Sequence, residues 1–269
     1  MKKVRKAERI AAIVNILTEN PNQVFTLTYF CQMFNCVKST ISDDIDGVKE
    51  VFKSYELGTI ETISGAAGGV YYNPLMSRDQ MLEFTGQLSE QLSDPSRIIP
   101  GGYLYTNDLL YCPKTCSKIG NALASLFKDV DIDYVITVET KGIPIAMMTA
   151  RVLNKPMVVV RNKSKLTDGT VIYMNYMSSS GHMIKTMCLS TKAVKKGSKV
   201  LFIDDFMKAG GTAKGIIELM QEFECEVVGV GVLMATKQPI QKLYHSHKSL
   251  LLLSEIDEKN KNVYIKTAL

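Results

Sequence analysis

Residues 200–215 read VLFIDDFMKAGGTAKG and set the architecture of the larger part of the chain. The stretch begins as an apolar run, passes through two adjacent acids and a pair of glycines, and continues in a helix-like pattern. This order is typical of a buried strand, a loop and a helix, and in open α/β sheets ligands bind beyond the carboxyl ends of the strands. The stretch therefore predicts both an α/β architecture and the place of a binding site.

The loop within this stretch is suited to hold an anion. Its consecutive backbone N–H groups, two residues without a Cβ atom and one hydroxyl come from Lys208, Ala209, Gly210, Gly211 and Thr212. Free N–H groups at the start of a helix, together with the helix dipole, favour negative charge. The Walker A pattern GxxxxGK[ST] is absent, so the loop predicts a phosphate site of another kind.

Asp204 and Asp205 stand just before that loop and need a different partner, because adjacent carboxylates would repel a second phosphate. Ionised carboxylates only accept hydrogen bonds, and the neighbouring hydroxyls of a ribose provide two donors. A ribose with a 5′-phosphate would satisfy the acids and the loop together. The alternative is a strand-ending turn that carries acids without a ligand, which would suffice for the two acids alone but explains IDDFMKAGGT as a unit less well.

The rest of the carboxyl-terminal part alternates between helical and strand-like patterns. Helical spacing marks residues 79–92, 116–127, 144–153 and 212–223, and β-like runs mark residues 134–138, 157–160, 171–176, 185–189, 199–203 and 227–233. Residues 178–181 join the third and fourth of these runs. Continuous apolar strands that alternate with helices favour a mostly parallel sheet flanked by helices on both faces. We expect one α/β domain over residues 76–269.

The first 75 residues follow a different pattern. Apolar residues at helical spacing predict helices over residues 5–20, 27–34 and 41–52, with Thr26 and Ser39 as N-caps of the second and third. Two short β-like runs around SGAAGG then predict a hairpin. Three helices with a tight second junction, followed by a hairpin, are typical of a winged-helix domain. The break at Asn73-Pro74 places its boundary near residue 75.

Two groups of residues in this domain are candidates for contacts with DNA. Base contacts are expected from exposed polar side chains at the start of the third helix, namely Lys38, Ser39, Thr40 and Ser42. Backbone phosphates could be engaged by the basic amino terminus, namely Lys2, Lys3, Arg5, Lys6 and Arg9. Asp43 and Asp44 are unfavourable near phosphates, and a helical protein-docking module is the alternative.

Composition bounds the class of protein. Of the 269 residues 46% are hydrophobic and 22% charged, as in an ordinary soluble globular protein. No apolar run approaches the roughly 20 residues of a membrane span and no signal-peptide core is present, so we expect a cytoplasmic protein that does not contact a membrane. The net charge is +5, and residues 141–199 carry eleven Lys or Arg against Asp168 alone. That bias makes a polyanionic ligand at least as good an interpretation as a solvated face.

The cysteines and histidines predict no metal site and no prosthetic group. Six cysteines lie scattered without a CxxC pair, so we expect them to be reduced. His245 and His247 form an HxH pattern, but no acid or thiol lies close by in the sequence to complete a set of three or four ligands.

The run IDDFMKAGGT resembles the phosphoribosyl pyrophosphate (PRPP) motif of type I phosphoribosyltransferases. The resemblance implies that the two acids hold the ribose hydroxyls and that residues 208–212 hold the 5′-phosphate. Enzymes of that family usually carry a threonine before GGT, where this chain has Ala209. The departure puts transfer chemistry in doubt.

The same resemblance implies an earlier loop that holds the pyrophosphate. Thr140, Lys141 and Gly142 follow the strand that ends at Val138 and match the place of that loop. Arg161 follows the next apolar strand and is similarly placed to meet phosphate oxygens.

Five segments together resemble the PurR-type regulators of purine synthesis genes: KSTISDDI, SGAAGGV, RIIPGGYLYTND, TKGIP and IDDFMKAGGT. This resemblance covers almost the whole chain. It implies a winged-helix domain fused to a phosphoribosyltransferase-like domain, a homodimer that binds a double-stranded DNA operator, and PRPP as an effector and not a substrate.

Further expectations attach to the same pocket. Magnesium could accompany PRPP, and guanosine tetraphosphate, a ribose bearing diphosphates, could compete for the site. Tyr103 and Phe206 could cover the ribose or a base, or they could serve only packing. The alternative function is a purine phosphoribosyltransferase with an accessory amino-terminal domain.

Overall fold

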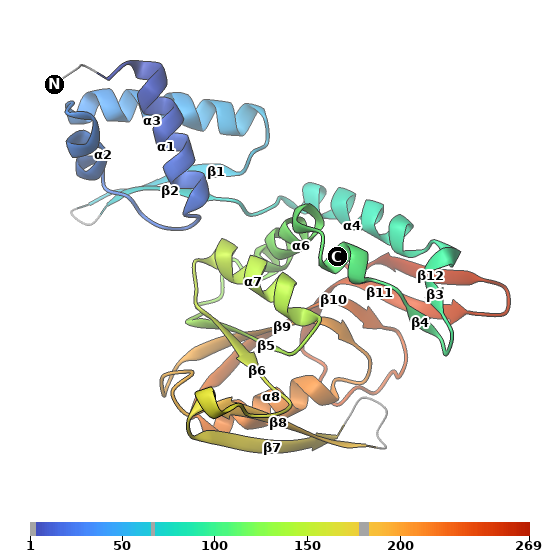
Figure 1. Ribbon diagram of the computed structural model, residues 1–269. Coiled ribbons are helices and arrows are strands. Elements are labelled where there is room, and N and C mark those ends of the chain that lie inside the picture. The colour runs from blue at the N-terminus through green and yellow to red at the C-terminus, as the bar shows by residue number, and fades with distance from the viewer. Residues whose placement is uncertain (1–3, 66–67, 178–182) are drawn as a thin grey trace. The chain divides into compact units, whose positions relative to one another are not determined.

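A computed structural model describes residues 4–65, 68–177 and 183–269. The chain divides into two compact units. The amino-terminal unit comprises Met1–Leu75 together with Arg151–Asn154, and the carboxyl-terminal unit comprises Met76–Ala150 and Lys155–Leu269. Figure 1 shows the elements of both units.

The amino-terminal unit has the predicted order of three helices and a hairpin. Its elements are α1 (Lys6–Glu19), α2 (Leu27–Phe34), α3 (Lys38–Ser54) and the antiparallel strands β1 (Thr59–Ile63) and β2 (Gly69–Asn73). As predicted, Thr26 caps α2, because its side chain accepts a hydrogen bond from the N–H of Tyr29. Asn35 then turns the chain in the left-handed conformation, with φ 50°. The helices pack around a core that includes Phe30, Ile41 and Ile45.

The start of α3 differs from the prediction. Val37 is the N-cap, Lys38 is the first helical residue, and Ser39 lies inside the first turn. Val37 is already extended, with φ −84° and ψ 158°, directly after the turn at Asn35 and Cys36. The helix can therefore begin before the first residue whose side chain is suited to cap it.

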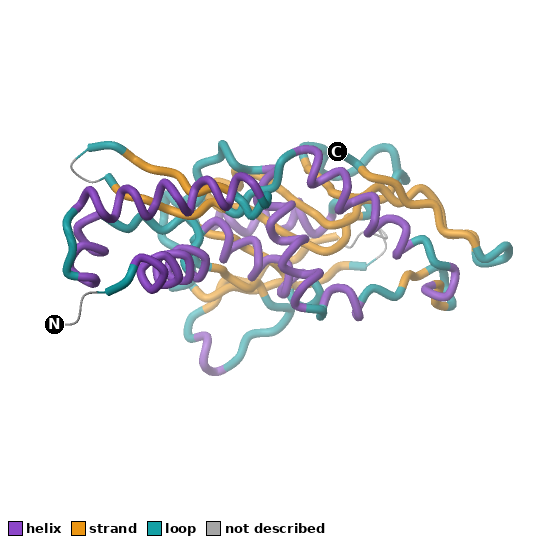
Figure 2. The backbone as a smooth tube through the Cα atoms, turned by 90° about the horizontal axis from the view of Figure 1, so that it is seen from above, coloured by secondary structure: helices purple, strands orange, loops and turns teal. Residues whose placement is uncertain are grey.

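The carboxyl-terminal unit is built on a six-stranded sheet with the order β12-β11-β10-β9-β5-β6. The sheet strands are β5 (Tyr134–Val138), β6 (Met157–Val160), β9 (Lys199–Met207), β10 (Glu226–Thr236), β11 (His247–Asp257) and β12 (Asn262–Thr267). All neighbours are parallel except β11 and β12. The other elements are α4 (Arg78–Leu92), β3 (Ile98–Ile99), β4 (Tyr103–Leu104), α5 (Asn107–Leu110), α6 (Pro113–Leu126), α7 (Gly142–Leu153), β7 (Val171–Met177), β8 (Ile184–Ser190) and α8 (Gly211–Glu222). The prediction of a mostly parallel sheet with flanking helices is confirmed (Figure 2).

Alternate residues of β10 show how both faces of the sheet are covered. Val230 and Val232 belong to the buried cluster that contains Ile216 and Leu219 of α8. The glycines between and before them face the other way, since a Cβ atom on Gly229 would lie 2.7 Å from the ring of Phe127, just after α6. Successive residues of a strand point to opposite faces, so α8 and the end of α6 cover opposite sides.

Two parts of this unit go beyond the sequence prediction. The β-like runs around residue 180 form a separate antiparallel hairpin, β7 and β8, which contacts α8 and does not join the main sheet. Residues 178–181, predicted to join them, lie outside the described residues. Strands β11 and β12 add an edge to the sheet that the periodicity did not reveal.

Two composition-based expectations can be compared with the described parts of the chain. No helix in them is long and apolar enough to cross a membrane. All six cysteines are free thiols.

Candidate functional site

Strand β9 carries both acids within the sheet and not in the loop after it. It runs through Met207, four residues beyond the predicted end, because β10 continues to pair with it and places Val232 opposite Asp204. The N–H of Asp205 donates a hydrogen bond to Oδ1 of Asp204 at 2.9 Å. This hydrogen bond holds the carboxyl group of Asp204 at the carboxyl end of a central strand.

The unliganded site disfavours the ionisation of both acids together. Burial raises the pKa of Asp204 well above its ordinary value, and the neighbouring charge of Asp205 raises it further. Burial also raises the pKa of Asp205, while its hydrogen bond with Asp204 and the charge of Lys141 act in the opposite direction. A partner that donates hydrogen bonds to the two carboxylates would relieve this conflict.

Gly142 brings the second predicted loop directly against the acids. It is the first residue of α7, and a Cβ atom there would lie 2.6 Å from Oγ1 of Thr137 and 2.8 Å from Oδ1 of Asp204. Only a residue without a side chain fits, since real Cβ atoms do not approach other atoms so closely. The hydroxyl of Thr137 is fully buried and makes no hydrogen bond. An unpaired buried hydroxyl beside a carboxylate is a feature expected of a binding site and not of a mere packing contact.

The loop after β9 presents unpaired backbone N–H groups. Gly210 is the N-cap of α8 with φ 78°, a left-handed conformation that favours glycine. In the described ranges, no hydrogen bond of the turns, loops and caps uses an N–H group of residues 209–212 as donor. These groups lie at the positive end of the α8 dipole, where an anion would be favoured.

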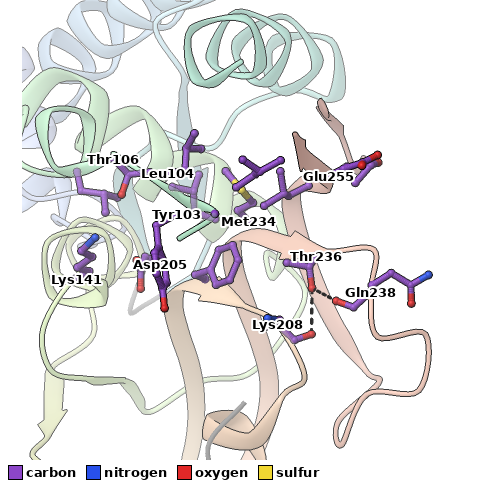
Figure 3. Close-up of a pocket in the computed structure, with 17 residues that line it drawn as sticks. Tyr103, Leu104, Thr106, Lys141, Asp205, Lys208, Met234, Thr236, Gln238 and Glu255 are labelled. Atoms are coloured by element: carbon purple, nitrogen blue, oxygen red, sulfur yellow. Dashed lines mark hydrogen bonds between the residues drawn. The ribbon is translucent and has the colours of Figure 1, made fainter. Parts of the chain in front are cut away.

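A cavity of about 450 Å³ opens beside Asp205. Lys141 and Asp205 lie on one side of it, and Thr236 and Gln238 lie on the other (Figure 3). Tyr103 and Phe206 line it and remain 69% and 42% exposed, so neither ring is committed to packing in the core. The remaining lining includes apolar side chains from four elements, namely Leu104, Leu110, Leu233, Met234 and Leu253.

Not every predicted site residue reaches this cavity. Arg161 makes an isolated antiparallel bridge with Cys188 of β8 and does not line the cavity. Asp204, Gly210 and Thr212 line a separate small recess beside it. The other predicted residues absent from the cavity lining are Thr140, Gly142, Ala209 and Gly211. Other residues that line the cavity carry no local motif. Thr236 ends β10, Gln238 follows it and Glu255 lies on β11, so only the fold brings these residues to the cavity.

Some of the residues predicted to contact DNA are exposed. Lys38, Ser39 and Ser42 are exposed at the start of α3, whereas Thr40 is half-buried. Arg5 is exposed, and its guanidinium pairs with Glu8 at 2.6 Å. Lys6 is exposed as well, and Lys2 and Lys3 lie outside the described residues.

Arg9 and Asp44 are not available to DNA. Nε of Arg9 lies 2.6 Å from Oδ2 of Asp44, and both side chains are buried, with residue exposures of 8% and 1%. The pair joins α1 to α3. The prediction that Arg9 could contact phosphates is therefore wrong, and Asp44 does not oppose them at the surface, because the two charges satisfy each other inside the unit.

Comparison with known families assigns each unit separately. The family described as "Bacterial purine repressor, N-terminal" matches residues 5–74, and the phosphoribosyl transferase domain matches residues 106–267. Among solved structures, adenine phosphoribosyltransferase from Rhodothermus marinus matches with a TM-score of 0.53 and 25% identity, over 64% of this chain and 99% of that one.

Curated relatives match over both units. The purine biosynthesis transcriptional repressor PurR of Bacillus subtilis is 43% identical over 264 residues, covering 98% of this chain and 93% of that protein. The purine biosynthesis transcriptional activator PurR of Lactococcus lactis subsp. lactis is 36% identical over 263 residues, covering 98% and 97%. Xanthine phosphoribosyltransferase of Lactobacillus helveticus is 32% identical over 152 residues, covering 55% of this chain and 79% of that protein.

Proposed function

The chain belongs to the PurR family of bacterial purine regulators, and from this premise we propose that it regulates purine genes by binding DNA with its amino-terminal unit and PRPP with its carboxyl-terminal unit. The observation that carries the proposal is the extent of the similarity. Relatives named as a repressor and an activator match 98% of the chain, both units included. The xanthine phosphoribosyltransferase matches only 55%.

The geometry of the site supports PRPP as the ligand. The carboxylates of Asp204 and Asp205 would accept hydrogen bonds from the two ribose hydroxyls, which relieves the conflict that raises both pKa values. The N–H groups of residues 209–212 would hold the 5′-phosphate. Lys141, across the cavity from the anion loop, would neutralise the pyrophosphate.

A magnesium ion would be held mainly by the ligand. Magnesium prefers oxygen ligands and in phosphate sites is bound by one or two carboxylates together with the phosphates. No cluster of three or more His, Cys, Asp or Glu suited to a metal occurs among the described residues. The two acids of β9 therefore fit an ion that arrives with PRPP better than a resident metal.

The amino-terminal unit would bind a double-stranded operator as part of a homodimer. The exposed Lys38, Ser39 and Ser42 lie at the start of α3, where a recognition helix meets bases. Guanosine tetraphosphate carries a ribose and diphosphates, so it would compete with PRPP for the anion loop and Lys141.

Titration calorimetry with PRPP tests the effector site. We expect Asp204→Asn to weaken binding at least tenfold, because each charge-assisted hydrogen bond contributes roughly 1.5–3 kcal/mol. Asp129→Asn is the matched control, since this exposed acid lies after α6 and outside the cavity. Equal affinities of wild type and Asp204→Asn would refute the assignment of the acids, and an absence of binding by wild type would refute PRPP as the effector.

The alternative function is phosphoribosyl transfer. The cavity and the relative named xanthine phosphoribosyltransferase favour it. We propose effector binding without turnover instead, because relatives that match both units are named as regulators. Incubation of the protein with PRPP, magnesium and each purine base should yield no nucleotide at ordinary enzymatic rates of about 1–1000 s⁻¹. Nucleotide formation at such rates would establish the enzyme.

A further inference from the structure

The anion loop after β9 has a second side, formed by its carbonyl groups. Where successive N–H groups converge on a ligand, the carbonyl oxygens point outward and need donors of their own. A loop whose carbonyls lacked partners would gain by turning them toward solvent or toward the ligand position. The partners of these carbonyls therefore determine whether the loop keeps its receptive shape.

The segment between β10 and β11, residues 237–246, supplies those partners and is here named the brace. The ammonium group of Lys242 donates a hydrogen bond to the carbonyl oxygen of Lys208. The N–H of Leu243 donates to the carbonyl oxygen of Ala209 at 2.7 Å. The carbonyl of Gly210 accepts from the N–H of Lys214 in α8, so each of the three carbonyls from Lys208 to Gly210 has a partner.

Packing and charge also favour the observed position of the loop. A Cβ atom on Gly210 would lie 3.0 Å from the N atom of Tyr244, so the brace rests directly on the turn that begins α8. Lys242 is half-buried, and burial lowers its pKa. None of the ion pairs formed by the described residues involves Lys242. Its positive charge therefore interacts with the carbonyl oxygen of Lys208.

We propose that the brace is a positioning element for the phosphate site, and that Lys242 holds the loop in its receptive shape through the carbonyl of Lys208. Lys242 acts from behind the loop and does not itself line the cavity. The inference rests on the proposed phosphate site, since the loop is argued to be held for an anion. It assigns a role to a residue 34 positions away from the loop in the sequence.

The test compares wild type with Lys242→Met, Lys242→Arg and a matched control. Lys237→Met is that control, because it removes a positive charge from an exposed position of the same segment. In the full-length protein without ligand, we expect the Leu243 amide to exchange with deuterium about tenfold faster in Lys242→Met, since a hydrogen bond to a charged group is lost. Lys242→Arg should retain most of the protection, and Lys237→Met all of it. An unchanged exchange rate of the Leu243 amide in Lys242→Met would refute the proposed role of the brace.

Calorimetry with PRPP provides the second readout. Affinity should fall about tenfold in Lys242→Met, recover in Lys242→Arg and remain unchanged in Lys237→Met. Faster exchange with wild-type affinity would overturn the positioning role. Faster exchange in a protein whose wild type binds no PRPP would instead support the brace and refute the proposed effector, so the two failures are distinguishable.

Discussion

Asp204 lowers the stability of the folded protein without ligand. Burial and the adjacent Asp205 raise its pKa in the folded protein. An acid with a raised pKa stays protonated to a higher pH in the folded than in the unfolded state. Its unfavourable effect on folding is therefore smallest below the unfolded-state pKa, and it grows as the pH rises from that value through the folded-state pKa. A destabilising carboxylate of this kind is typical of a functional site, in line with the proposed effector site.

We therefore predict that Asp204→Asn stabilises the unliganded protein at neutral pH. The variant should unfold at a higher temperature than wild type at pH 7, and the difference should shrink as the pH is lowered toward 4, where the wild-type carboxyl is protonated. Calorimetric or fluorescence melting at several pH values measures this. A variant that melts below wild type at pH 7 would show that the carboxylate contributes a favourable interaction instead.

Residues near the site differ in how far the sequence reveals them. Asp204, Asp205 and Gly210 belong to one contiguous motif whose chemistry can be argued from neighbouring positions. Thr137 and Lys242 belong to no motif, because the groups that they face lie on other segments of the chain. Their roles depend on distances that only the folded chain sets.

At the scale of elements, α1 and α3 are joined by the buried pair of Arg9 and Asp44. Removal of one partner leaves the other charge buried without compensation, which is strongly destabilising. We predict that Asp44→Asn lowers the unfolding temperature of the amino-terminal unit by several degrees and weakens DNA binding as a consequence. Asp43→Asn is the matched control, because Asp43 is exposed at the adjacent position of α3. Equal melting of the two variants would contradict a structural role for the pair.

The elements themselves were predictable where one local pattern dominated. Helix α2 and strands β5 and β6 have the bounds that periodicity and apolar runs indicate. The start of α3 and the end of β9 were not, since the first depends on a backbone turn at Asn35 and the second on continued pairing with β10. Strand pairing is a tertiary property and overrides the local signal of two acids.

For the whole molecule, DNA affinity should carry the signature of phosphate contacts. Each neutralised phosphate releases counterions, so the logarithm of the binding constant should fall linearly with the logarithm of salt concentration. We predict that Lys6→Gln reduces the magnitude of this slope by about one, because exposed Lys6 belongs to the basic segment expected to contact phosphates, while Lys237→Gln in the carboxyl-terminal unit leaves it unchanged. Titration of an operator fragment at several salt concentrations measures the slope. An affinity that stays flat as salt rises would favour a protein-docking module.

An effector changes DNA binding only through its different affinity for two states of the protein. Relatives of this chain include both a named repressor and a named activator. The two-unit architecture therefore does not by itself decide between repression and activation. The titration above, repeated with PRPP, shows whether the effector strengthens or weakens DNA binding.

The tight packing of Gly142 against Thr137 and Asp204 has a consequence for the evolution of this position. The space that a methyl group would need is already filled by the oxygens of Thr137 and Asp204, so residue 142 can be enlarged only if both neighbours move. A lineage that enlarges residue 142 must therefore displace the threonine hydroxyl and the acid together. Under the proposed function such a step would disturb the effector site, and selection would keep a glycine at position 142.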